Sequence, residues 1–207
     1  MNIEKITDSL IFDTGLRFDG KTVARKGKTI LQFVSADLPQ NSGFEILVEL
    51  GYRHIEATFK LQIFSGHLIN LMQSTSVETK KLVQNLLEAN SDQAEIILTL
   101  NDRKLDYQDI VDFSENWKDI EIQLISKPIE SEIDLELRQN INELILFWVE
   151  KTISILYPLL PLEEDIEDSI DAILEKSAEE GRQYQVTSTR YERKRQNRVA
   201  CLAYFGF

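Results

Sequence analysis

Five basic side chains near the end of the chain have the types and spacing to bind phosphate. They lie in TSTRYERKRQNRVACLAYFGF, residues 187–207, where Glu192 is the one acid. Arginine offers a fixed fork of donors that fits phosphate oxygens, and cations that replace counterions supply much of a protein's affinity for DNA. The segment therefore predicts a short DNA-contacting helix, basic at its start and buried at its end; the alternative is a solvated charge run on a surface helix. The five candidates are Arg190, Arg193, Lys194, Arg195 and Arg198.

The rest of the chain has the opposite charge. The 207 residues include 23 Lys and Arg against 35 Asp and Glu, a net charge of -12. Residues 182–207 hold six of the bases and one of the acids, which leaves 17 bases and 34 acids elsewhere. The bulk of the chain should repel a duplex, so any DNA contact must come from local basic patches or from a neutral pocket that takes a single base.

A second basic patch lies near the N-terminus, in TGLRFDGKTVARKGKTILQFV. A hairpin here could touch phosphate; the alternative is a solvated turn whose lysines protect an edge strand from pairing. Its members are Arg17, Lys21, Arg25, Lys26 and Lys28.

The sequence of the C-terminal segment resembles that of a known protein family. Arg190-Tyr191-Glu192-Arg193, Asn197-Arg198, Ala200-Cys201-Leu202-Ala203 and Gly206 resemble the segment that leads into the HNH domain of bacterial restriction endonucleases, including those specific for 5-methylcytosine. Upstream, GFEILVELGYRHIEATFK is similar to the N-terminal region of such proteins.

The resemblance implies a DNA-cleaving hydrolase whose catalytic domain lies outside these residues. In the family, a CxxC pair, a His-His pair, an Asn and a further His follow the basic segment. Here Cys201 is the only cysteine, and His54 and His67 are the only histidines. We therefore expect no catalytic residue, metal ligand or cofactor site within this chain, which would be a truncated, nuclease-free region.

The hydrophobic pattern predicts an α+β fold, mainly an antiparallel sheet with a helical insert, followed by a C-terminal helical segment. A short strand at Leu10–Phe12 is followed by strands joined by turns at Gly15, Gly20 and Gly27. Further strands are expected at 30–36, 44–50, 52–63, 94–100 and 117–128, with a turn at Asn101-Asp102 before a short strand. Two helices, capped by Ser65 and Ser76, interrupt them.

Three segments are expected: residues 1–130 as a strand-rich recognition domain, 131–181 as a helical packing and dimerisation segment, and 182–207 as the basic lead-in. The apolar stripe before Pro158 is too wide for one neighbour, so we expect it to pack on the sheet and on a partner helix, with a homodimer as a hypothesis. The acids of 161–181 could bind Mg²⁺ or Ca²⁺, screen the basic run, or form a solvated face.

Cellular context follows from composition. A single cysteine fits a reducing cytoplasm, and the longest apolar run is broken by Glu150, Lys151 and Pro158, which argues against a membrane span. Two functions remain open. The chain is either the DNA-positioning region of an HNH-type endonuclease or a protein-interaction or sensor module without DNA contact. If a base is flipped into a pocket, the aromatic candidates are Tyr52, Phe59, Tyr107 and Trp117, with core positions as the alternative.

Overall fold

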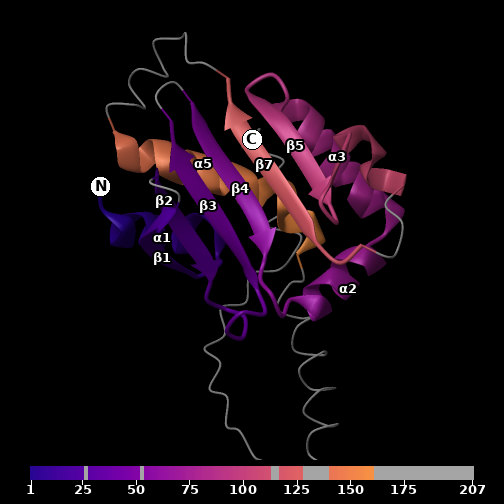
Figure 1. Ribbon diagram of the computed structural model, residues 1–207, viewed down its shortest axis with the longest axis horizontal. Helices are drawn as coiled ribbons and strands as arrows, with labels where there is room; N and C mark the ends of the chain where they lie inside the picture. The colour runs from indigo at the N-terminus through magenta and orange to yellow at the C-terminus, as the bar shows by residue number, and fades with distance from the viewer. Residues whose placement is uncertain (26–27, 52–53, 113–116, 128–139, 161–207) are drawn as a thin grey trace, which may run out of the picture. The chain divides into compact units, whose positions relative to one another are not determined.

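The computed structural model describes residues 1–25, 28–51, 54–112, 117–127 and 140–160. The chain divides into two units after Leu159, and the fold described here is that of the first. Its core is a seven-stranded antiparallel sheet in the order β1-β2-β3-β4-β7-β5-β6 (Figure 1). The α+β class predicted from the sequence is confirmed. The strands are β1 Phe18–Arg25, β2 Lys28–Ser35, β3 Phe44–Leu50, β4 Ile55–Leu61, β5 Ala94–Leu100, β6 Arg103–Leu105 and β7 Ile120–Ser126.

The described helices are α1 Ile3–Thr14, α2 Gly66–Ser74, α3 Val77–Asn90, α5 Ile141–Leu156 and the short 3-10 helices η1 Tyr107–Asp112 and η2 Tyr157–Leu159. α1 and α5 pack side by side on one face of this sheet, α3 packs against α5, and α5 crosses behind β3 and β4 in Figure 1. Strand alternation explains this layering, because every second side chain of a strand points to the same face. One row in register across five strands is almost fully buried: Phe33, Ile46, Phe59, Ile122 and Leu98.

The predicted strand at Leu10–Phe12 is wrong, because these residues form the end of α1. Ile6 and Leu10 are buried at helical spacing, whereas Ile11 and Phe12 are exposed, so a run that reads as three consecutive apolar residues presents only one to the core. Asn2 accepts a hydrogen bond from the Lys5 N–H at the start of the helix. Gly15, with φ of 73°, ends it in the left-handed conformation.

Gly20 was predicted to be a turn and instead lies inside β1. A Cβ added there would meet Ile3 Cγ2 at 2.4 Å and Thr7 Cγ2 at 3.0 Å. The glycine therefore permits α1 to pack directly on the strand. The third predicted glycine turn, at Gly27, lies outside the described residues.

Most other element predictions are confirmed. The alternating runs around Gly51 form the β3–β4 hairpin, in which the Gly51 N–H donates to the His54 carbonyl at 2.9 Å. Asn101 and Asp102, both with positive φ, form the turn between β5 and β6. Ser76 caps α3 by accepting from the Thr79 N–H, whereas Ser65 precedes α2 without a side-chain cap bond.

The wide apolar stripe before Pro158 packs within the chain. α5 packs against β3 and β4 of the sheet and against α1 and α3. Nine of its sixteen residues are buried, among them Trp148 and Ile153. The partner helix predicted from the stripe is therefore α1 of the same chain, and the unit that holds the sheet extends through α5. The predicted segments beyond Leu160 lie outside the described residues.

Candidate functional site

The second face of the sheet carries both polar and aliphatic side chains, and no helix of the described residues covers it. Three rows of side chains alternate with the buried rows. The middle row holds Gln32, Leu47, Thr58 and Gln123, flanked by Glu49 and Glu56 on one side and by Glu45, Lys60 and Glu121 on the other. We call this surface the open face.

A shallow hollow of about 170 Å³ lies on the open face. Its lining combines three carboxylates, one ammonium, one hydroxyl and two aliphatic side chains, so it favours a cation or a hydrogen-bond donor over a phosphate. Leu47 is 7% exposed and Thr58 4% exposed, because the longer side chains around them cover the floor. The lining residues are Ile30, Leu47, Glu49, Glu56, Thr58, Lys60 and Glu121.

Partners on the same strand or on a neighbouring strand hold these carboxylates in place. Glu56 accepts from Gln123 Nε2 at 2.5 Å and from Thr58 Oγ1 at 3.3 Å. Lys60 and Glu121, directly opposite across β4 and β7, form an ion pair at 2.6 Å.

The same pattern continues at the rim of the open face. Lys28 pairs with Glu49, and Gln32 donates to Glu45. Such cross-strand pairs order the face. No group of three or more metal-ligating side chains is found among the residues that the structure describes.

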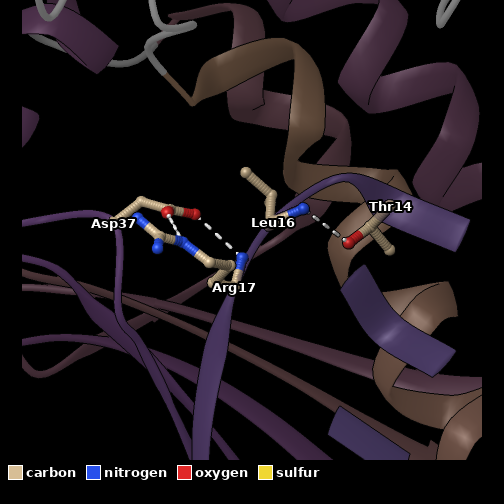
Figure 2. A network of polar contacts seen from close by, with 4 residues as sticks. All are labelled: Thr14, Leu16, Arg17 and Asp37. Atoms are coloured by element: carbon tan, nitrogen blue, oxygen red, sulfur yellow. Dashed lines mark hydrogen bonds and ion pairs between the residues drawn. The ribbon is translucent and has the colours of Figure 1, made fainter. Parts of the chain in front are cut away.

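The second basic patch is not gathered into one phosphate site in the described part of the chain. Arg17 Nε donates to Asp37 Oδ1 at 2.6 Å, and its backbone N–H donates to Oδ2 at 2.8 Å (Figure 2). Lys28, at the far end of the β1–β2 hairpin, pairs with Glu49. Lys21 lies exposed between them, opposite Gln32.

Two members of that patch are placed only in part or not at all. Arg25 closes β1 opposite Lys28 in the backbone register. Lys26 lies outside the described residues. The described members of the patch therefore lie spread along the β1–β2 hairpin and do not meet at one point.

The five C-terminal cations, Arg190, Arg193, Lys194, Arg195 and Arg198, lie outside the described residues, as does Tyr52. Of the other aromatic candidates, Phe59 is fully buried and Trp117 is 4% exposed, so both belong to the core. Tyr107 is half-buried in η1. His54 is exposed, and burial lowers the pKa of His67.

Two ionisable residues inside α5 were missed as candidates. Burial, a hydrogen bond to Asp13 and the charge of Asp13 raise the pKa of Glu150 to about 8. Its Oε1 is buried without a hydrogen-bond partner among the described residues. The signal in the sequence for both residues is the pair of adjacent charges in a strongly apolar helix. The same pair also indicates that this apolar run does not span a membrane.

Lys151, next in sequence, is only 3% exposed. Its ammonium donates to Gln93 Oε1 and lies 4.7 Å from the Phe147 ring centroid and 5.4 Å from that of Trp148. Burial lowers the pKa of the amine. Its partner lies 58 residues away, so sequence spacing could not have identified it.

Comparison with known protein families, curated proteins and solved structures finds no match to this chain. Within the described ranges, no helix has the length and apolar character needed to cross a bilayer.

Proposed function

We propose that this chain is the DNA-positioning region of an HNH-type restriction endonuclease, in which the segment 182–207 contacts DNA. The observation that carries the proposal is the C-terminal run of cations, in the letters that resemble the lead-in to an HNH domain. Phosphate contacts of this kind orient a protein on the duplex, and base contacts elsewhere supply specificity.

The charges of the sheet domain support this division of roles. Three of its cations, Arg17, Lys28 and Lys60, are engaged by carboxylates of the same domain. The hollow on the open face is lined by three carboxylates and one ammonium, which disfavours a phosphate backbone. We therefore expect the sheet domain to contribute little of the electrostatic affinity.

The test measures binding of the full chain to duplex DNA over a range of salt concentrations. Replacing Arg190, Arg193, Lys194, Arg195 and Arg198 with Gln should weaken binding strongly. It should also reduce the salt slope by about one unit for each phosphate that the variant no longer neutralises. The control, which removes three cations instead of five, replaces Arg17, Lys21 and Lys28 with Gln. Equal losses of affinity in both variants, or unchanged affinity in the first, would overturn the proposal.

A second candidate, a protein-interaction module, is favoured by the open face itself. The uncovered acidic hollow suits a Lys- or Arg-rich segment of a partner protein. Replacing Glu49, Glu56 and Glu121 with Gln should then weaken binding of a basic peptide more than replacing three acids elsewhere, at Glu4, Glu88 and Asp92. If both triple variants weakened peptide binding equally, the interaction would depend on net charge and not on the hollow.

A further inference from the structure

Among the described residues, the outer edge of β1 is the longest open edge of the sheet. β1 has eight residues, and no strand of the described residues pairs with its outer side. The opposite edge is β6, which has only three residues. An unpaired edge presents backbone N–H and C=O groups in a row, and a second strand can complete their hydrogen bonds.

The side chains of β1 leave this edge accessible. Asp19, Lys21, Thr22 and Ala24 are exposed. Thr22 and Ala24 lie on the same face as Gly20, which is the face that α1 covers. Their exposure indicates that α1 covers the beginning of β1 and leaves its second half open.

We propose that β1 pairs antiparallel with β1 of a second copy of this chain, about a two-fold axis at Thr22. A two-fold pairing uses the same strand on both copies, so the surface must be complementary to itself. Because directly opposed residues share a face in a continuous sheet, Thr22 then faces its own counterpart. Lys21 faces Val23, and Gly20 faces Ala24.

The registers centred on Lys21 and on Gly20 are disfavoured. An axis at Lys21 sets two ammonium groups directly opposite each other, which destabilises the pair. An axis at Gly20 brings the two glycines about 5 Å apart. The side chains of Ile3 and Thr7, which already fill the space above Gly20, would then crowd those of the second copy.

The axis at Thr22 avoids both problems. The two copies of Gly20 are then separated by four residues along the strand, about 14 Å. Each copy of α1 therefore lies next to the exposed second half of the other β1. Lys21, which would block pairing at its own axis, faces an aliphatic side chain.

Cysteine crosslinking of the full chain tests the register. In a Cys201→Ser background, which removes the only native cysteine, Thr22→Cys should form a disulfide-linked dimer under mild oxidation. Directly opposed strand residues have Cα atoms about 5 Å apart, within the range that a disulfide spans. Ala24→Cys is the matched control, because it is exposed on the same strand but lies about 14 Å from its counterpart.

Sedimentation of the unmodified chain supplies the second measurement. A dimer in the micromolar range together with crosslinking at Thr22→Cys alone supports the proposal. A monomer throughout that range overturns it. So does a dimer that crosslinks at Lys21→Cys or Ala24→Cys and not at Thr22→Cys. The proposal goes beyond the proposed function and is independent of it, because neither measurement involves DNA.

Discussion

Asp37 binds Arg17 twice, once through the guanidinium Nε and once through the backbone N–H. The two bonds join the end of the α1–β1 connection to the loop after β2, as Figure 2 shows. Next to them, the Leu16 N–H donates to Thr14 Oγ1 at 3.1 Å. The carboxylate thus fixes the entry into the first strand as well as neutralising a cation.

Asp37→Ala should lower the free energy of unfolding by about 1 kcal/mol, because the Arg17 N–H loses its acceptor and the exposed ion pair adds little. Asp37→Asn keeps an acceptor for the N–H and should lose less than half as much. Urea unfolding of both variants measures the difference. Equal losses would mean that the charge, and not the backbone bond, carries the stabilisation.

Arg17→Gln should leave DNA affinity within about twofold of the parent chain, since its guanidinium already has a carboxylate partner. Lys21→Gln, at an exposed position of the same hairpin, is the matched comparison. Binding titrations at low salt provide the measurement. A tenfold loss for Arg17→Gln would contradict the expectation and restore the N-terminal patch as a phosphate site.

Gly20→Ala should destabilise the protein by about 1–3 kcal/mol, because the new Cβ would lie 2.4 Å from Ile3 Cγ2. In an Ile3→Ala background the same change should cost much less, since the clashing atom is gone. Gly66→Ala is the control, because nothing lies within 4 Å of its added Cβ. If the double-mutant cycle showed no coupling between Gly20→Ala and Ile3→Ala, close packing of α1 on β1 would be excluded.

Glu150 should make stability depend on pH. Its folded pKa, about 8, is above the ordinary 4.5, so between these values the unfolded state has lost a proton that the native state retains. The contribution of Glu150 to the free energy of unfolding is therefore fully present below about pH 4.5. It falls as pH rises toward 8, by on the order of 1 kcal/mol after allowance for partial exposure.

Glu150→Gln should flatten that dependence, because an amide does not titrate. Denaturant unfolding at pH 5, 6.5 and 8 measures it, with Glu143→Gln on the same helix as the control. An unchanged slope in Glu150→Gln would show that other groups produce the pH dependence.

Lys151→Met should leave stability within about 1 kcal/mol of the parent. The thioether fills the space of the buried aliphatic stem, while the loss of a desolvated charge offsets the lost bond to Gln93. Lys151→Ala should cost about 2–4 kcal/mol through the cavity it leaves. If Lys151→Met and Lys151→Ala were equally destabilised, the hydrogen bond from the ammonium to Gln93 would contribute more to stability than packing of the side chain.

Strand and helix positions were predictable where periodicity was unambiguous. Ile120–Ser126 alternates between buried and half-buried positions along its whole length, and α3 follows its serine cap. Leu10–Phe12 failed because three adjacent apolar residues carry no period of their own. Gly20 failed because a glycine that allows close packing cannot be distinguished from a turn glycine until the packing partner is known.

The candidate site was harder to predict than the fold. The open face is built from alternate residues of four strands, and only the register places Glu56 beside Gln123, 67 positions later. Arg17 and Lys28 are near in sequence, yet each pairs with an acid that lies 20 or 21 positions further along the chain. Charge spacing along a chain predicts a surface only once strand pairing is known.

The position of β7 between β4 and β5 has a consequence for how the molecule is made on the ribosome. β1 to β4 form consecutive hairpins and can assemble as they emerge. The β5–β6 hairpin, although synthesised earlier than β7, has no place in the sheet until residues 120–126 have left the exit tunnel. A translation pause before that point would hold an incomplete sheet with unpaired strand edges. Synonymous codon changes before the codons for residues 120–126 should therefore alter the yield of folded protein more than changes after them.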